Sequence, residues 1–439
     1  MFWYFLRNNL YFFFRTFFKR LHVKNADRIR VSNPMLVTMN HPNSFMDTIA
    51  ISAALFYPRT YYMARGDAFK KGITTTILKA IGIVPIFRAR DGGGHSSIKK
   101  NLDSFKVVYD LLNKRQKIIV LAEGISLQER RLQPIQKGTA KMAFSYLEQG
   151  GHDDLKILPI GVTYSTPSKF RGDVYYQIGE PILVKDYYNE YLQHPAQTII
   201  KLTHLIEEGM KPLVPTLINK ENDLLIEQLQ PILKKQFIET KNLNYNNLEH
   251  QQQYWEFIVN KLNTITENKP EQIVKIRTET DHYTKQLSQL KLRDHLIRNA
   301  SNNKSVLTFF NLIVFILGFP IYVIGKTLNF IPYFYGKRVA DKTCKDIEFH
   351  AAVNFGAGTF IWVITFLVEL LLLGLICKNW YILLVYALVK VVCGRIGLSY
   401  SPFKKKMLGA LRLHKIKTGN PSLYTNLIAE RSAIVTNFL

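Results

Sequence analysis

Short apolar runs alternate with helical patterns between residues 29 and 185. Runs of four to seven residues fit strands buried in a sheet, and the segments between them carry apolar residues at helical spacing. This alternation predicts an α/β fold, an open mixed sheet with crossover helices. The expected strands are 35–39, 61–64, 83–87, 117–121, 157–163 and 174–178, and the expected helices are 48–55, 73–81, 97–112 and 137–147.

The edge at which these strands end is the expected ligand site. In open α/β sheets, ligands bind outside the carboxyl ends of the strands. The loops that follow Met39, Phe87 and Leu121 are therefore the first candidates for functional residues.

Two changes of composition divide the rest of the chain. Residues 186–303 are rich in charged and amide side chains, with apolar residues three and four apart, which predicts a helical accessory region with a turn at 242–247. Beyond residue 303 lie three long apolar segments, whose lengths suit helices that cross or dip into a bilayer. The expected domains are an interfacial helix over 1–32, an α/β domain over 33–185, the helical region over 186–303 and a membrane region over 304–439.

The membrane region fits two topologies. A full crossing by the uncharged residues 305–325 would place the basic residues of 326–345 opposite the basic helical region, against the positive-inside tendency. A re-entrant hairpin that breaks at 318–320 and returns through 328–335 avoids this. A second hairpin would then turn at 378–379 and keep the basic residues 404–406 in the cytoplasm.

Each of the last two apolar segments contains one charge. Residues 351–377 carry only Glu369, and residues 379–394 carry only Lys390. Charges inside membrane helices usually pair with one another or face a polar site. Glu369 and Lys390 are therefore expected either to pair across the hairpin or to face a polar headgroup pocket.

Residues 1–32 combine aromatic and basic side chains. A signal peptide is a poor fit, because its apolar segment is uninterrupted and follows the positive residues. Here aromatic residues come first, and basic residues lie between them. An aromatic, basic helix in the bilayer interface fits better. The alternative is a helix that packs its aromatic residues on the protein's own core.

The net charge of +25 indicates an acidic partner. Membrane lipids and phosphorylated substrates fit this charge. Nucleic acid is not expected, since the bases are spread over interfacial and helical segments without an RNA-binding motif. The chain has three cysteines, Cys344, Cys377 and Cys393. All lie beyond residue 300, so no cysteine in the first three hundred residues can act as a nucleophile. The histidines show no ligand spacing, so neither a metal nor a cofactor is expected.

A histidine and an aspartate follow the first expected strand. His41 lies on the strand-to-helix loop, and Asp47 lies at the start of the helix. An aspartate in this place can fix the tautomer of the imidazole through one ring nitrogen, which leaves the other nitrogen to accept a hydroxyl proton. For these two residues taken alone, capping and packing are the commoner explanation.

Three further blocks follow in order at strand ends. They read GIVPIFR at 82–88, VLAEGIS at 120–126 and ILPIG at 157–161, after NHPNSFMD at 40–47. This ordered set resembles the four blocks of the glycerolipid acyltransferase family, the glycerol-3-phosphate and lysophosphatidate acyltransferases, over residues 36–182. The helical region and the C-terminal membrane helices are similar to the long form of the fungal-type and related bacterial glycerol-3-phosphate acyltransferases.

The resemblance implies a role for each matching residue. His41 would be the base and Asp47 its orienting partner. The implied reaction needs no metal and no covalent enzyme intermediate, because the acceptor hydroxyl attacks a thioester of CoA or acyl carrier protein directly. The enzyme would be membrane-bound, with its catalytic domain on the cytoplasmic face. The implied substrate-binding residues are Gly82, Phe87 and Arg88 for the acceptor, Glu123, Gly124 and Ser126 for its phosphate and hydroxyl, and Pro159 on the thioester side.

Two departures from the family pattern matter. Five residues separate His41 from Asp47 where four are common, a spacing that favours the fungal-type subgroup. The third block lacks its usual arginine, so Arg130, Arg131 or Lys137 would have to contact the acceptor phosphate. Acylation of a different amphiphile, such as an ornithine- or sugar-based lipid, therefore stays open. A membrane-tethered lipid-binding protein without turnover is the alternative of another class.

Overall fold

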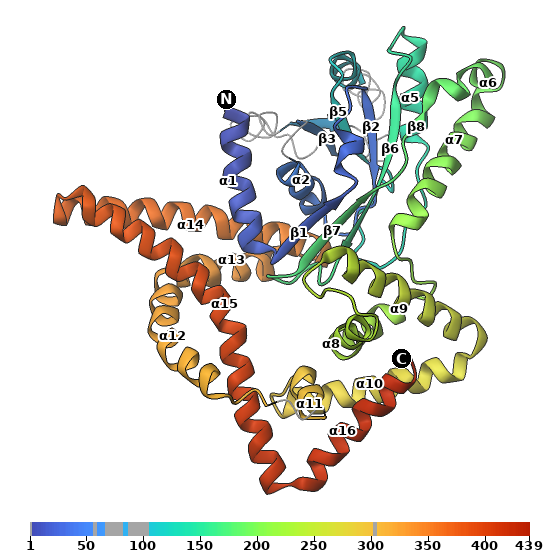
Figure 1. The fold of residues 1–439 in the computed structure, drawn as a ribbon. Coiled ribbons are helices and arrows are strands. Elements are labelled where there is room, and N and C mark those ends of the chain that lie inside the picture. Colours follow the sequence, from blue (N-terminus) through green and yellow to red (C-terminus); the bar gives the residue numbers. More distant parts are fainter. Residues whose placement is uncertain (1, 56–58, 66–81, 87–104, 302–304) are drawn as a thin grey trace. The chain divides into compact units, whose positions relative to one another are not determined.

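The structure is a computed structural model that describes residues 2–55, 59–65, 82–86, 105–301 and 305–439 (Figure 1). These residues form two compact units. The first comprises Met1–Thr216 with Asp346–Ala352, and the second comprises Leu217–Lys345 with Val353–Leu439. The expected boundaries at residues 185 and 303 differ from this division, for reasons that lie in the packing of each unit.

The described part of the first unit contains an eight-stranded mixed sheet, which confirms the predicted fold class. The strand order is β1-β7-β6-β2-β5-β3-β4, with β8 paired to β6. Strand β2 runs parallel to both β5 and β6, while the β6–β7 and β6–β8 pairs are antiparallel. The strands are β1 (Arg20–Lys24), β2 (Met35–Met39), β3 (Thr60–Arg65), β4 (Ile83–Ile86), β5 (Lys117–Leu121), β6 (Lys156–Tyr164), β7 (Asp173–Ile178) and β8 (Ile182–Leu183).

Helices cover both faces of the sheet. One face packs against helical residues 105–113, α5 (Gly138–Glu148) and α7 (Pro195–Met210), with Leu202 and Ile206 of α7 fully buried in that core. The short α6 (Tyr188–Gln193) joins the same layer through Tyr191, which stacks on Phe144 at 4.2 Å between ring centroids. Because α6 and α7 bury their apolar faces on the sheet, the first unit extends past residue 185 to Thr216.

The other face carries α2 (Phe45–Ala54) and α1 (Phe2–Phe17). Phe14 and Phe18 are fully buried, and the ring of Phe18 lies 5.9 Å from that of Tyr164 on β6. These aromatic side chains pack on the protein's own core, as the alternative for this segment predicted. Tyr11 and Phe12 are exposed, so an interfacial role stays a prediction for the other side of α1.

The expected helix over residues 1–32 is wrong beyond Phe17. Residues 20–24 form β1, which pairs in parallel with β7 at the sheet edge. The guanidinium of Arg20 holds this register by donating to both carboxylate oxygens of Asp173, at 2.9 and 2.6 Å. A residue 153 positions further along the chain therefore helps to hold this basic segment as a strand.

The second unit contains a helical bundle with its own apolar core. Helical spacing predicts this bundle, and buried Leu225, Leu229 and Ile232 lie on one side of α8. The predicted turn at 242–247 is confirmed, because it lies between α8 and α9, where Asn247 caps α9 by accepting from Glu249 N. The bundle comprises α8 (Asn222–Thr240), α9 (Leu248–Asn268), α10 (Pro270–Gln289), α11 (Asp294–Ser301), the end of α15 (Trp380–Gly419) and α16 (Pro421–Thr436).

Three helices among the described residues are long and apolar enough to cross a membrane: α12 (Phe309–Leu328), α14 (Ile347–Cys377) and α15. The predicted turn at 378–379 is confirmed, since Lys378 and Asn379 join α14 to α15. The predicted break at 318–320 is wrong. Helix α12 continues through Pro320 because Gly318 packs against the ring of Tyr400 on α15, and the chain turns at Asn329 before α13 (Phe330–Thr343).

Candidate active site

Two loops meet at the carboxyl edge of the sheet. Strands β2 and β5 are parallel neighbours, with Met39 opposite Leu121, so the segments that follow them leave the sheet side by side. The first segment carries His41 and the second carries Glu123. The N–H of Ala122 donates to the carbonyl of Met39 at 3.3 Å, which keeps the two segments paired beyond the last ladder residues. The register thus brings the ends of these two expected strands to one edge, and ligand binding at this edge stays a prediction.

His41 and Asp47 form a hydrogen-bonded pair. Nδ1 of His41 lies 2.9 Å from Oδ2 of Asp47, whose side chain is fully buried, while that of His41 is 14 % exposed. Ser44 precedes α2 with a positive φ of 47°, and the loop turns there so that Asp47 in the first turn of the helix faces back toward the histidine. A carboxylate acceptor at Nδ1 favours the tautomer with its proton there, leaving Nε2 to accept a proton.

Three further donors hold Asp47 in place. Its Oδ2 also accepts from the N–H of Asn43 at 2.9 Å, and its Oδ1 accepts from the hydroxyl of Tyr164 at 2.7 Å. The hydroxyl of Tyr176 donates to the backbone carbonyl of Asp47 at 2.8 Å. Burial and the neighbouring carboxylate raise the pKa of Tyr164, so its hydroxyl stays protonated and can donate. Every interaction of this carboxylate therefore fixes its orientation.

Glu123 supports the histidine through the backbone. Its Oε2 accepts from the N–H of His41 at 2.8 Å, and its Oε1 accepts from the N–H of Gln133 at 2.9 Å. Burial raises the pKa of Glu123 to about 7, although the two N–H groups favour its ionised form. The carboxylate thus bridges the histidine loop and the segment after β5.

Ser126 completes the link between the loops. Its hydroxyl donates to the carbonyl of His41 at 3.0 Å and accepts from the N–H of Ser44 at 3.1 Å. Gly124 has a φ of 68°, a left-handed conformation that glycine adopts without steric cost, and it lets the chain turn from Glu123 toward Ser126. The predicted residues Glu123, Gly124 and Ser126 are therefore brought together with His41 and Asp47.

Residues 20–163 match the family model described as Acyltransferase. This part of the chain is an acyltransferase domain. The match spans the dyad, Glu123 and Ser126, and it ends one residue before Tyr164. The predicted resemblance is thereby confirmed.

Two curated relatives from Saccharomyces cerevisiae (strain ATCC 204508 / S288c) are similar to this chain. Glycerol-3-phosphate O-acyltransferase 1 is 25 % identical over 64 % of this chain and 37 % of its own length. Glycerol-3-phosphate O-acyltransferase 2 is 31 % identical over 25 % of this chain and 15 % of its own length. The chain therefore spans less than two fifths of the length of either relative. Among solved structures, the 1-acyl-sn-glycerophosphate acyltransferase from Thermotoga maritima matches with a TM-score of 0.32 and 17 % identity, over 45 % of this chain and 74 % of its own.

Two predicted residues of the acyltransferase domain lie away from the dyad. Gly82 lies at the amino end of β4, with a φ of 89°, and its carbonyl accepts from the N–H of Tyr62. Pro159 lies in the middle of β6, where a Cβ on Gly209 of α7 would meet its ring at 3.0 Å. Since side chains alternate along a strand, Pro159 faces α7 while Tyr164 faces α2. Both positions contact neighbouring elements of the fold, and substrate contact by either stays a prediction.

The remaining predicted contacts concern the acceptor phosphate. Phe87 and Arg88 lie outside the described residues. The guanidinium of Arg130 donates to the carbonyls of Tyr164 and Ser165, at 3.2 and 3.1 Å, so it holds the chain after β6. Arg131 pairs with Glu129 at 3.0 Å. Both arginines therefore already have partners in the acyltransferase domain, whereas Lys137 is exposed just before α5.

The sequence did not indicate the two tyrosines that hold Asp47. Tyr164 and Tyr176 come from β6 and β7, more than a hundred residues beyond the helix that they contact. In the sequence, each looks like an ordinary aromatic residue of a strand, and the chain has 23 tyrosines. Only the alternation of side chains along β6 and β7 turns these two toward α2, and that requires the folded sheet. Among the described residues, no group of three or more His, Cys, Asp or Glu side chains is placed to hold a metal ion.

Proposed function

We propose that this protein transfers a fatty acyl group from a thioester to a hydroxyl of glycerol-3-phosphate or 1-acylglycerol-3-phosphate in a membrane. The observation that carries the proposal is the contact between His41 Nδ1 and the buried carboxylate of Asp47 at the carboxyl edge of the sheet. The acyltransferase family match and the similarity to two yeast glycerol-3-phosphate O-acyltransferases support the acyl transfer and the acceptor class.

In the proposed mechanism, Nε2 of His41 accepts the proton of the acceptor hydroxyl as its oxygen attacks the thioester carbonyl. A carbon–oxygen bond forms, the carbon–sulfur bond breaks, and the leaving thiolate takes the proton from Nε2. Asp47 stabilises the imidazolium that exists between these steps, because its carboxylate accepts from the N–H at Nδ1. The histidine ends the cycle in the protonation state in which it began.

The supporting residues keep the base in one position during this cycle. Glu123 and Ser126 bind the backbone N–H and carbonyl of His41, so the loop does not depend on the side chain alone. A base that is already oriented spends no free energy on reorganisation when the substrate arrives. We assign the acceptor phosphate to Arg88, the basic residue of the second block, as the resemblance implies.

A second acceptor class is favoured by one observation. Arg130 and Arg131, the basic residues nearest the altered third block, are engaged with backbone carbonyls and with Glu129. A non-phosphorylated amphiphile, such as an ornithine- or sugar-based lipid, would need neither of them. This candidate differs from the first in the acceptor alone, and the same dyad would carry out the transfer.

The test of the function is a matrix of donors and acceptors. Membranes that contain the protein are given glycerol-3-phosphate, lysophosphatidate or a sugar-based lysolipid, each with acyl-CoA and with acyl carrier protein, beside membranes that lack the protein. We expect acylated product with at least one phosphorylated acceptor. If only the sugar-based acceptor gave product, the acceptor would be a non-phosphorylated amphiphile. Absence of product from every donor–acceptor pair would contradict the proposal.

We also propose that the catalytic domain faces the cytoplasm. Helix α13 and the segment after the apolar part of α15 are rich in lysine and arginine, which the positive-inside tendency assigns to that side. In sealed vesicles of known orientation, acyl-CoA added on the cytoplasmic face should support product formation without a detergent. Product only after supply to the other face would contradict this orientation.

A further inference from the structure

Two lysines from different helices of the second unit converge on one tyrosine. Nζ of Lys404, on α15, donates to the hydroxyl oxygen of Tyr322 at 3.2 Å and lies 4.5 Å from the centre of its ring. Nζ of Lys326, one helical turn after Tyr322 on α12, lies 5.9 Å from the same ring centre. The phenol is buried, and both ammonium groups lie within 6 Å of its ring centre.

This cluster has a positive charge without a counter-charge from the protein. Among the described residues, no carboxylate forms an ion pair with Lys326 or Lys404. The contrast with the nearby Lys390 is clear, because that lysine is fully buried and paired with Glu369 on α14. Two adjacent ammonium groups repel each other, and an anion that binds both would be stabilised by charge-assisted hydrogen bonds.

The contacts between α12 and α15 give the depth of the cluster. Two hydrogen bonds join these helices. Tyr400 donates to the carbonyl of Phe315 near the start of α12, and Asn329 donates to the carbonyl of Lys390, earlier on α15, at 3.2 Å. The helices are therefore antiparallel and in contact over most of α12. Gly325 permits this approach, since a Cβ there would overlap the carbonyl of Cys393.

Measured along α15, Lys404 lies at the surface of the bilayer. Exposed Trp380 and Tyr381 begin the helix with the aromatic side chains typical of one interface. At about 1.5 Å per residue, Lys404 is roughly 36 Å further along the axis, just beyond the hydrocarbon core of about 30 Å. Its side chain reaches back to the hydroxyl of Tyr322, so the cluster lies beside this boundary of the hydrocarbon core.

By the same measure, the turn between α12 and α13 lies inside the bilayer. Lys390 is roughly 15 Å along α15 from Trp380, near the bilayer midplane. The amide of Asn329 binds the carbonyls of Lys390 and Gly325 and accepts from Nε1 of Trp362 at 2.8 Å, so the polar groups of this turn are satisfied by protein. Helices α12 and α13 thus form a re-entrant hairpin, with Tyr322 on its entering arm.

We propose that Tyr322, Lys326 and Lys404 bind the phosphate of an anionic phospholipid headgroup at the entrance of this hairpin. The two ammonium groups supply the charge. The hydroxyl of Tyr322, which accepts from Lys404, uses its own hydrogen to donate to a phosphate oxygen. The depth of the cluster favours a lipid headgroup over a phosphate in solution as the source of the anion.

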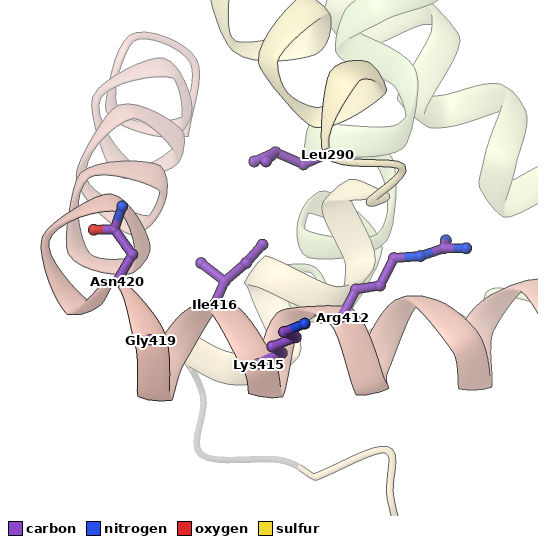
Figure 2. Close-up of a pocket in the computed structure, with 6 residues that line it drawn as sticks. All are labelled: Leu290, Arg412, Lys415, Ile416, Gly419 and Asn420. Atoms are coloured by element: carbon purple, nitrogen blue, oxygen red, sulfur yellow. The ribbon is translucent and has the colours of Figure 1, made fainter.

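A second basic region on α15 provides a matched control. An open pocket of about 330 Å³ lies where α10 ends and α15 meets α16, and Figure 2 shows Arg412, Lys415 and Ile416 along one side of it and Leu290 opposite. Arg412 already donates to the carbonyl of Lys291 at 3.2 Å. Lys415 is on the same helix as Lys404 but more than two turns nearer the end of α15, so its neutralisation removes one charge without touching Tyr322.

The first experiment measures lipid preference. The full chain in phosphatidylcholine nanodiscs is titrated with spin-labelled phosphatidylglycerol and spin-labelled phosphatidylcholine. We expect preference for phosphatidylglycerol, a loss of about tenfold in Lys326→Gln/Lys404→Gln, and a smaller loss in Tyr322→Phe. Lys415→Gln should keep the preference. An unchanged preference in the double variant, or an equal loss in Lys415→Gln, would overturn the site.

A competition arm separates the two sources of phosphate. Inorganic phosphate and glycerol-3-phosphate are added to the nanodiscs that hold the labelled phosphatidylglycerol. We expect neither to displace the lipid in the wild-type chain. Displacement by either compound, lost in the double variant, would assign the site to soluble phosphate and overturn the headgroup proposal. Neither result depends on acyl transfer, so the proposed function stands or fails separately.

The depth is tested by cysteine labelling in sealed vesicles. Cys344 follows α13, and an Asn246→Cys variant marks the exposed turn of the helical bundle. A re-entrant hairpin places both on the same side, so an impermeant maleimide should label both or neither, with Cys377 reacting from the opposite side. Labelling of Cys344 and Asn246→Cys from opposite sides would show a full crossing by α12 and overturn the proposed depth.

Discussion

Two buried aspartates, one in each unit, have nearly the same surroundings. Asp47 accepts a hydrogen bond from the hydroxyl of Tyr164 at 2.7 Å, and Asp294 accepts one from the hydroxyl of Tyr283 at 2.9 Å. Both carboxylates are almost completely inaccessible to solvent. They differ in the basic partner, which is His41 for Asp47 and Arg431, at 2.9 Å, for Asp294.

The partner decides what each carboxylate can do. Arg431 is permanently charged, and its other donors bind the carbonyl of Ile232 at 2.9 Å and the amide of Gln236 at 3.2 Å. That arrangement joins α8, α11 and α16 through a basic partner that keeps its charge. His41 can gain and lose a proton at Nε2 while Asp47 holds Nδ1. A buried carboxylate with a tyrosine is thus structural beside arginine and suited to base catalysis beside histidine.

The largest expected effect is on stability and belongs to the second unit. Arg431→Met leaves Asp294 buried without a cation, which should lower the free energy of unfolding by about 3–5 kcal/mol. The double variant Asp294→Asn/Arg431→Met removes both charges and should lower the free energy of unfolding clearly less. Thermal unfolding in detergent measures both. Equal losses in the single and double variants would show that the charge pair is not what stabilises this bundle.

A pH effect follows from Glu123, a buried carboxyl that has no cationic partner among its hydrogen bonds. Burial raises its pKa from the ordinary 4.5 to about 7. Between these values the folded state binds more protons than the unfolded state, so stability should fall as pH rises from about 4.5 to 7, by on the order of 3 kcal/mol. Glu123→Gln should lose this slope. A variant with the same slope as the wild-type chain would refute the assignment.

The catalytic half of the comparison predicts a loss of rate. Asp47→Asn keeps the size of the side chain but offers an amide in place of a carboxylate oxygen, which disfavours the reactive tautomer of His41. We expect kcat to fall at least about a hundredfold. Asp186→Asn, at an exposed aspartate of the same unit, should leave kcat unchanged. A fall of less than about tenfold in Asp47→Asn would place Asp47 among structural carboxylates such as Asp294.

The two tyrosines near Asp47 allow a finer separation. Tyr164→Phe removes a hydrogen bond to the carboxylate itself, so kcat should fall about tenfold with the acceptor KM unchanged. Tyr176→Phe removes a bond to the backbone carbonyl of Asp47 and should lower stability by about 1 kcal/mol with little change in kcat. Similar effects of the two changes on kcat would show that Tyr164 acts on the fold alone.

Local patterns predicted the central strands well. Residues 35–39 and 117–121 are short runs that are apolar apart from Thr38 and Lys117, which is the pattern of a strand buried on both faces. The same reasoning located His41, Asp47 and Glu123, because all three follow strands that end at one edge. The turn between α12 and α13 was misplaced because Pro320 and Gly318 are strong local signals, whereas packing against Tyr400 on a distant helix determines the outcome.

Other features depend on partners that are far along the chain. Strand β1 pairs with β7, where Arg20 binds Asp173. Leu21 and Val23 alternate with polar residues in it, but five residues are too few to be told from the end of the basic segment without that distant partner. Helix α7 was assigned to the accessory region on composition, yet Leu202 and Ile206 complete the core under the sheet. Tyr164 depends on the same kind of distant contact, so single-sequence patterns contain no record of it.

The most direct test of the account is acyl transfer by His41→Ala. This change removes the base and leaves the buried Asp47 with Tyr164 and Asn43 as donors. Turnover should be abolished while the protein stays membrane-associated. The matched variant His204→Ala, at an exposed position on α7, should retain wild-type activity. Near-wild-type turnover in His41→Ala, measured on the same membranes and at saturating substrates, would contradict the central claim that this histidine is the base.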